Sequence, residues 1–127
     1  MGNQILDKSK AFALRVIKLY QYLCDEKHEY ILSKQILRSG TSIGANAREA
    51  TRGQTLPVFY SKMNISLSEA DETAYWLELL HESGYISAEQ FNSLYADAEE
   101  LIKILVAITK SQKGGKNAPV QMCNSTF

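Results

Sequence analysis

The chain has 127 residues, a length at which one hydrophobic core can stabilise a single domain without a disulfide or a metal. Its 14 basic and 14 acidic residues cancel, so the molecule has no net charge that would draw it to nucleic acid or to an anionic membrane. No run approaches the roughly 18 apolar residues of a membrane span, and the first residues lack the pattern of a signal peptide. We therefore expect a cytoplasmic protein without membrane contact.

The charges are unevenly distributed along the chain. Residues 1–53 carry nine Lys or Arg against five Asp or Glu, residues 54–100 carry one against nine, and residues 101–127 carry four against none. If helices from different thirds pack side by side, the molecule has a basic side and an acidic side. This distribution suits an anionic partner or charge-complementary self-assembly.

Apolar residues recur at spacings of three and four, and no useful length alternates with period two, which predicts an all-α protein. Four helices are expected, at about 5–27, 29–52, 56–82 and 88–112. They form a bundle over residues 1–113, and a disordered tail over 114–127 is expected to follow. The residues expected to face a shared core are Ile5, Phe12, Val16, Leu19, Leu23, Leu32, Ile36, Ile43, Ala47, Ala50, Leu56, Tyr60, Met63, Leu67, Ala70, Ala74, Leu77, Phe91, Leu94, Ala98, Leu101, Leu105 and Ile108.

The segments between the helices carry capping signals. Thr55 can cap the third helix, with Pro57 in its first turn, where no intrahelical donor is lost. Gly84 is suited to a left-handed stop, and Ser87 with Gln90 forms a capping box for the fourth helix. Because short loops between long helices make neighbours antiparallel, we expect an up-down-up-down four-helix bundle. The boundary near Glu26 to Glu29 has no Gly or Pro and is the least defined.

Two glycines interrupt the expected second helix. Gly40 and Gly44 each cost a helix interior about 1 kcal/mol relative to alanine. A close helix crossing would offset this cost, because a glycine lets another helix approach. The crossing helix belongs either to the same bundle or to another subunit.

The same helix carries a line of cations. Lys34, Arg38, Arg48 and Arg52 fall within one arc, almost opposite the apolar stripe. Packing does not require such a line of cations. These cations can neutralise the phosphates of a nucleic acid. The alternative is an ordinary solvated face with Glu49 close by. No aromatic residue that could stack on bases lies on this line, so sequence-specific reading of a single strand is not indicated.

Three polar residues of this helix have a structural interpretation. Ser42 flanks the core side of the helix, and Asn46 lies one turn from Glu49, with which it could form a fixed polar contact. A partly buried amide must find hydrogen-bond partners. We favour the interpretation that these polar groups form hydrogen bonds within the fold and have a structural role.

The expected third helix has a second apolar stripe, formed by Ile65, Trp76 and Leu79. A helix that is apolar on two faces is buried on two faces, which favours oligomerisation in so small a bundle. Glu69 and Glu72 lie along this stripe and could meet the basic helix of a neighbouring subunit.

Enzyme chemistry is not indicated. Glu78-x-x-His81 matches half of the paired pattern of di-iron bundles, but no carboxylate stands at the centre of the second or fourth apolar stripe. The chain has two histidines and no glycine-rich phosphate loop. We expect no catalytic residue, no metal and no cofactor.

Two segments resemble a known family. They are Gln35-Ile-Leu-Arg-Ser-Gly-Thr-Ser-Ile-Gly-Ala-Asn-Ala-Arg-Glu-Ala50 and Glu69-Ala-Asp-Glu-Thr-Ala-Tyr-Trp-Leu-Glu-Leu-Leu80. The family consists of small four-helix-bundle proteins encoded in 23S rRNA intervening sequences, and it includes the accessory variability determinants of diversity-generating retroelements. The likeness covers about residues 8–112.

The resemblance implies a homopentamer and, for some members, binding to nucleic acid or to a reverse transcriptase. The family's helix pattern maps onto Arg38, Ser42, Asn46 and Glu49, and Arg52 with Gly53 matches the basic residue and glycine that often follow. The first hypothesis is therefore a homopentameric module that binds RNA or a ribonucleoprotein through its basic face. The second is a protein-interaction scaffold without nucleic-acid binding. Neither hypothesis involves a small-molecule substrate.

Overall fold

The computed structural model describes residues 2–114, which form four α-helices and no β-strand. The helices are α1 (Gly2–Asp25), α2 (Leu32–Thr51), α3 (Leu56–Glu82) and α4 (Ala88–Gly114). The all-α prediction is confirmed for this part of the chain. The tail predicted from residue 114 lies outside the described residues except for Gly114, which ends α4, and the domain boundary stays a prediction.

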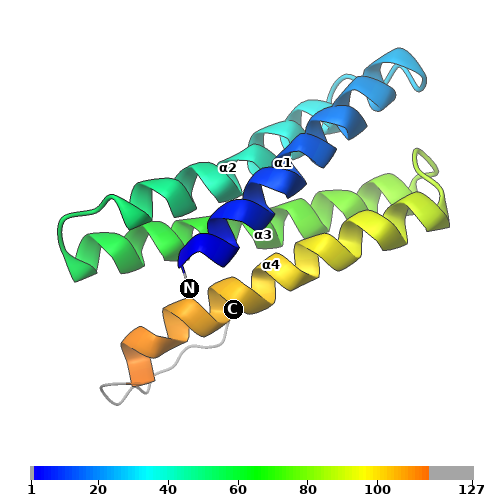
Figure 1. Cartoon of the computed structure of the whole chain (residues 1–127). Coiled ribbons are helices and arrows are strands. Elements are labelled where there is room, and N and C mark those ends of the chain that lie inside the picture. Colours follow the sequence, from blue (N-terminus) through cyan, green and yellow to red (C-terminus); the bar gives the residue numbers. More distant parts are fainter. Residues whose placement is uncertain (1, 115–127) are drawn as a thin grey trace.

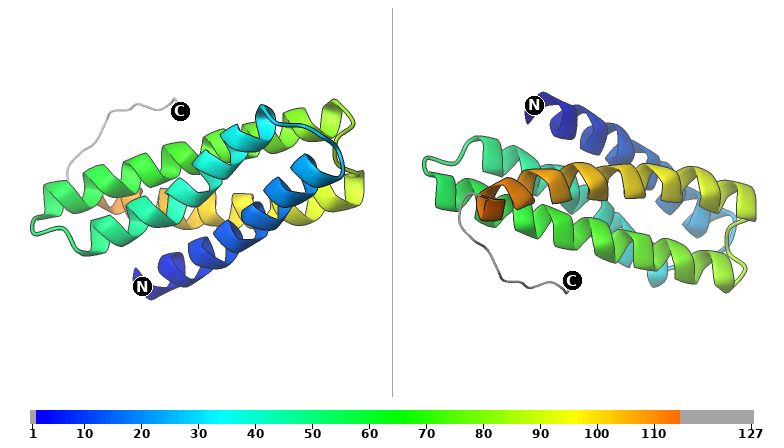
Figure 2. Two further views of the ribbon diagram at one scale, coloured as in Figure 1. Left: turned by 90° about the horizontal axis from the view of Figure 1, so that it is seen from above. Right: turned by 90° about the horizontal axis from the view of Figure 1, so that it is seen from below.

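The four helices lie side by side as a bundle (Figures 1 and 2). The connections over residues 26–31 and 83–87 are at one end of the bundle, and the connection over residues 52–55 is at the other. α2 packs between α1 and α3, and α3 packs between α2 and α4. The contact between α1 and α4 is less extensive, and two ion pairs, Lys8 with Glu100 and Arg15 with Asp97, span it.

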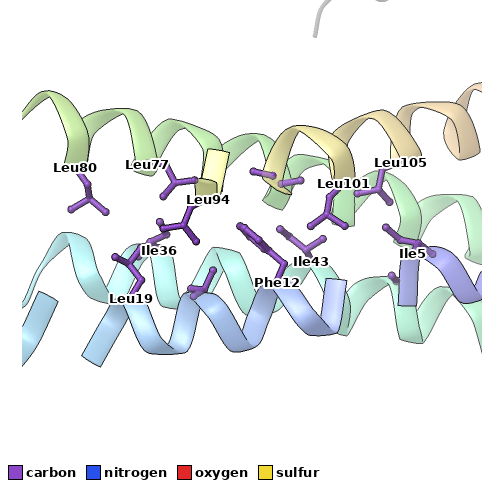
Figure 3. Packing of buried hydrophobic residues seen from close by; sticks show 14 of the residues in the cluster. Ile5, Phe12, Leu19, Ile36, Ile43, Leu77, Leu80, Leu94, Leu101 and Leu105 are labelled. Carbon is purple, nitrogen blue, oxygen red and sulfur yellow. The ribbon is translucent and has the colours of Figure 1, made fainter. Parts of the chain in front are cut away.

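The core contains most of the residues predicted from the apolar spacing (Figure 3). All five residues of α1 that were predicted to face the core are buried, and Phe12 is the largest fully buried side chain. Leu56 is 69% exposed, because it begins α3 at the end of the bundle. The remaining predicted positions that are only half-buried are Leu32, Tyr60, Leu67, Phe91 and Ile108.

α2 begins at Leu32 rather than near residue 29, and the side chain of Glu29 is the reason. His28 has a positive φ of 54°, and the chain then turns so that the Glu29 carboxylate, only 8% exposed, meets the start of α2. Its two oxygens accept hydrogen bonds at 2.7 to 3.2 Å from the backbone N–H groups of Ile31, Leu32 and Ser33. A carboxylate here also complements the positive end of the helix dipole.

The other helix ends follow the sequence signals. The Thr55 hydroxyl accepts from the backbone N–H of Val58 at 3.2 Å. Ser87 and Gln90 cap one another reciprocally at 2.8 and 3.1 Å, as a capping box requires. Gly84 has a φ of +88°, the left-handed conformation expected at the end of α3.

Candidate nucleic-acid interface

The two glycines of α2 face α1 of the same chain. A Cβ atom on Gly40 would lie 2.8 Å from both methyl groups of Val16, and one on Gly44 would lie 3.0 Å from Ser9 Oγ. Real Cβ contacts are rarely this short, so α1 and α2 approach as closely as they do because both residues are glycine. Of the two crossings that the sequence allowed, packing inside the bundle therefore accounts for both glycines, and a subunit interface is not needed to explain them.

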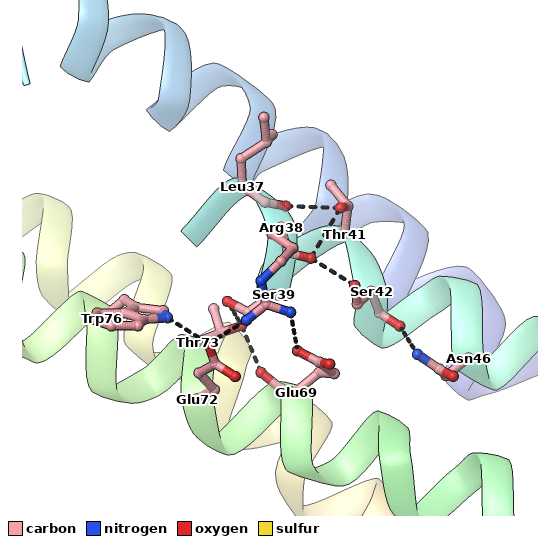
Figure 4. Close-up of polar contacts among 10 residues, drawn as sticks. All are labelled: Leu37, Arg38, Ser39, Thr41, Ser42, Asn46, Glu69, Glu72, Thr73 and Trp76. Atoms are coloured by element: carbon pink, nitrogen blue, oxygen red, sulfur yellow. Dashed lines mark hydrogen bonds and ion pairs between the residues drawn. The ribbon is translucent and has the colours of Figure 1, made fainter. Parts of the chain in front are cut away.

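Arg38 is held by two carboxylates of α3 (Figure 4). Its Nη1 lies 3.3 Å from Glu69 Oε1, and its Nη2 pairs with Glu72 Oε2. Trp76 Nε1 donates to the same Glu72 oxygen at 3.0 Å. The hydrogen bond with Glu72 raises the pKa of the Arg38 guanidinium above its ordinary value. We call this group of four residues the α2–α3 clamp.

Buried hydroxyl groups connect α2 to α3 beneath the clamp. Thr73 Oγ1 lies 2.8 Å from Ser39 Oγ and 2.7 Å from the carbonyl oxygen of Glu69. Ser66 Oγ donates to the carbonyl oxygen of Ile43 at 2.7 Å. Ser39, Ser66 and Thr73 are fully buried, so these hydrogen bonds form away from water and fix how the two helices pack.

The three residues predicted as structural polar groups bond to helix backbone or to α3. Ser42 Oγ donates to the carbonyl oxygen of Arg38 at 2.7 Å, and Asn46 Nδ2 donates to that of Ser42 at 2.9 Å. Glu49 lies 2.9 Å from Lys62 Nζ of α3. The amide of Asn46 therefore bonds to backbone and Glu49 to Lys62, in place of the polar contact suggested between those two side chains.

Arg48 and Arg52 line a groove of about 510 Å³ between the first half of α1 and the second half of α2. Lys10 of α1 is a third cation in the groove, and Asp7 is a carboxylate in it. Among the side chains that the structure describes, those of residues 4–111, none of these four has an oppositely charged partner within 4.0 Å. The groove therefore combines three cations that form no ion pair with the described side chains and one carboxylate.

The structure thus divides the predicted basic line. Arg38 belongs to the clamp, Arg48 and Arg52 to the groove, and Lys34 is exposed near the start of α2. Sequence reasoning missed Lys10 and Asp7. They lie on a different helix, and no motif links them to α2.

The second apolar stripe of α3 is partly exposed. Ile65 is 41% exposed, Trp76 and Leu79 are half-buried, and neighbouring Tyr75 is 54% exposed. Glu69 and Glu72, predicted to meet a neighbouring subunit, pair with Arg38 of their own chain. The apolar residues remain available for contact, whereas the two carboxylates are already engaged.

Comparison with known proteins identifies the family. The sequence profile described as "23S rRNA-intervening sequence protein" matches residues 2–107, most of the chain. The chain belongs to this family. A 51% identical protein of unknown function, from the S23 ribosomal protein family of Bacteroides thetaiotaomicron, has a crystal structure that matches with a TM-score of 0.85. The match covers 86% of this chain and 97% of that chain. A comparison with curated proteins finds no match.

Membership confirms the resemblance inferred from the segments around Arg38 and Trp76. In this family member, no helix of the described residues has both the length and the apolar character needed to cross a membrane. Within the same residues, no three His, Cys, Asp or Glu side chains gather as a metal site would require. Glu78 and His81, the half match to a di-iron pattern, contact Tyr95 and Phe91 respectively.

Removing the clamp arginine has a small expected effect on stability. Because Arg38 is half-exposed, replacing it with alanine should lower the free energy of unfolding by about 0.5 to 1 kcal/mol. Trp76 is the single tryptophan of this family member, and its indole shares Glu72 with Arg38. A changed tryptophan emission in the folded Arg38→Ala variant, with urea unfolding followed in parallel, would support the clamp. An emission spectrum identical to that of the wild type would contradict it.

Alkaline pH should reveal the hydrogen bond between α3 and α4. Tyr95 donates to Glu78 Oε2 at 2.7 Å, and this bond with a carboxylate, followed by burial, raises the pKa of Tyr95 from 10.0 to about 12. The contribution of this hydrogen bond to stability is therefore complete below pH 10 and is lost as the pH rises through about 12. In a titration of tyrosinate absorbance, Glu78→Gln should lower the pH at which one tyrosine ionises. In Tyr95→Phe that same ionisation step should be missing from the curve. A titration curve that Glu78→Gln leaves unchanged would contradict the assignment.

Proposed function

We propose that this protein is a non-enzymatic, cytoplasmic binding module that assembles as a homopentamer and contacts RNA through the cations of the α1–α2 groove. The bundle has up-down-up-down topology, which the positions of the three connections support (Figure 1). The RNA is either free or part of a ribonucleoprotein. A reverse transcriptase is a second partner class compatible with the family.

The main support for RNA binding comes from the α1–α2 groove. Lys10, Arg48 and Arg52 converge on one concave surface, and no carboxylate of the described residues pairs with them. Their charge is therefore available to a ligand, unlike that of Arg38. Phosphate neutralisation by Lys and Arg, with release of counterions, is the main source of affinity of proteins for nucleic acids. A local excess of cations suffices for this contact even though the whole chain is neutral.

The assembly proposal depends on α3 and on family membership. Ile65 and Tyr75 expose apolar surface on the outer face of α3, beside the half-buried Trp76 and Leu79. Burial of such residues between subunits is favourable at about 25 cal/mol per Å² of apolar area. Sedimentation velocity of the full chain should give a species of five chains. A stable monomer at all concentrations would contradict the assembly.

Charge removal in the groove tests the RNA contact. The Arg48→Ala/Arg52→Ala double variant should bind an unstructured RNA about tenfold to a hundredfold more weakly at about 50 mM salt, because two phosphates are no longer neutralised. Both side chains are exposed, so the fold should tolerate the change. Fluorescence anisotropy of a labelled RNA measures the difference in affinity.

Two variants serve as matched controls. Lys18→Ala/Lys27→Ala removes two exposed cations of the first 27 residues outside the groove, and Arg38→Ala removes a cation already paired with glutamate. Both should keep RNA affinity within about twofold of the wild type, since neither removes a free groove cation. Equal weakening in all three variants would show that overall charge, not the groove, binds RNA. No measurable binding by the wild type at about 50 mM salt would favour the protein-interaction scaffold instead.

A further inference from the structure

The groove is lined by hydrogen-bond acceptors as well as by cations. Thr41 Oγ1 donates its proton to the carbonyl oxygen of Leu37 at 2.8 Å, and Thr51 Oγ1 donates to that of Arg48 at 2.9 Å. A hydroxyl has one proton and two lone pairs, so each threonine has only lone pairs left to offer to the groove. Asp7 adds a carboxylate, which accepts hydrogen bonds and donates none.

This pattern is a poor match for a ligand made of phosphates alone. Phosphate oxygens are acceptors, so they fit Lys10, Arg48 and Arg52 but not the threonine lone pairs, and Asp7 repels them. A complementary ligand needs anionic groups for the cations and hydroxyl donors for the acceptors. A ribose phosphate has both, whereas a deoxyribose within a strand has no free hydroxyl.

The spacing of the two arginines favours a strand over a single nucleotide. Arg48 lies in the last turn of α2 and Arg52 is the C-cap that follows it, four residues further on, which is about 6 Å along the helix axis. This separation lets the two guanidinium groups meet successive phosphates of one backbone. The groove volume of about 510 Å³ is that of a site for a small segment of ligand.

We infer that the α1–α2 groove binds a single RNA strand by its sugar-phosphate backbone and that Asp7 distinguishes RNA from DNA by accepting a hydrogen bond from a ribose 2′-hydroxyl. The inference rests on the proposed RNA contact and adds the chemical group that is recognised. Lys10, Arg48 and Arg52 hold the phosphates on either side, and Thr41 and Thr51 provide further acceptors. Recognition is of the sugar, not of the base, since the groove contains no aromatic side chain among its lining residues.

The test compares four probes on the full chain. They are a labelled unstructured RNA, DNA of the same sequence, the same RNA with 2′-O-methyl groups, and adenosine 5′-monophosphate as a competitor. The wild type should prefer RNA over DNA by about tenfold, because a hydrogen bond to a charged acceptor is involved. The 2′-O-methyl strand should bind like DNA, because its ribose oxygen has no proton to donate.

Substitution of Asp7 separates recognition from general affinity. Asp7→Ala should bring the ratio of RNA to DNA affinity close to one, and it should raise DNA affinity because a repulsive charge is removed. Asp7→Asn keeps a neutral acceptor and should give an intermediate ratio. Asp25→Ala, which removes an exposed carboxylate at the far end of α1, should leave the ratio of the wild type unchanged.

The outcomes distinguish this inference from the proposed function. Equal binding of RNA and DNA by the wild type, or a ratio that Asp7→Ala leaves unchanged, would overturn the role of Asp7 while the groove contact with RNA stands. Competition by adenosine 5′-monophosphate at concentrations similar to the RNA would overturn the assignment to a strand. Failure of every probe to bind would reject the proposed function itself, and the inference with it.

Discussion

Replacing Gly40 with valine should lower the free energy of unfolding by about 3 kcal/mol, the upper part of the usual range for overpacking a core. Even the first added carbon would lie 2.8 Å from both methyl groups of Val16, which is fully buried and cannot move into solvent. The higher helix propensity of valine relative to glycine offsets only a few tenths of a kcal/mol. Urea unfolding followed by circular dichroism, at one fixed chain concentration, measures the destabilisation.

Two further variants test the cause of this destabilisation. Ala45→Val places the same side chain at an exposed position of α2 and should cost only about 0.5 kcal/mol. Val16→Ala combined with Gly40→Val should recover part of the stability, because it makes room for the new side chain; a double-mutant cycle gives the coupling. A stable Gly40→Val variant that fails to assemble would instead place this glycine between subunits.

Replacing Glu29 with alanine should cost about 2 to 3 kcal/mol. Three backbone N–H groups at the start of α2 lose their acceptor, and a charged cap of this kind contributes more than an ordinary one. The site is buried, so water replaces the carboxylate poorly. Thermal or urea unfolding measures the change in stability, and hydrogen exchange should show weaker protection of the first turn of α2.

The neighbouring glutamate provides the control. Glu26 lies in the same connection, but its side chain is exposed, so Glu26→Ala should change stability by no more than about 0.5 kcal/mol. Glu29→Gln, which keeps one acceptor oxygen, should fall between the two. Equal stabilities of Glu29→Ala and Glu26→Ala would mean that the carboxylate does not hold the start of α2.

Local patterns predicted the helices and most of the core because both depend on short-range rules. The spacing of Phe12, Val16 and Leu19 defines one face of α1 whatever the rest of the chain does. Gly84 and the capping pair of Ser87 and Gln90 are placed as expected, since a cap involves residues close in sequence. Glu29 is different. Its side chain caps from before the helix, and a glutamate in a charged connection has no distinguishing signal.

The candidate site was harder to predict because it depends on which helices meet. The cations of α2 form one line on a helical wheel, but α3 lies against Arg38 and α1 borders Arg48 and Arg52. The partners Glu69 and Glu72 are more than 30 residues from Arg38, and Lys10 is 38 residues before Arg48. Gly40 and Gly44 indicated a close crossing, yet only the structure identifies α1 as the helix that crosses there.

The salt dependence of RNA binding tests the central claim most directly, because its slope reports how many phosphates the protein neutralises. For the wild type, log Kobs should fall linearly with log salt concentration. In Arg48→Ala/Arg52→Ala the slope should be less steep by about 1.4, or about 0.7 for each single-strand phosphate that is no longer neutralised. Arg38→Ala should keep the slope of the wild type. An unchanged slope in the double variant, or an equal reduction in Arg38→Ala, would contradict RNA binding by the groove.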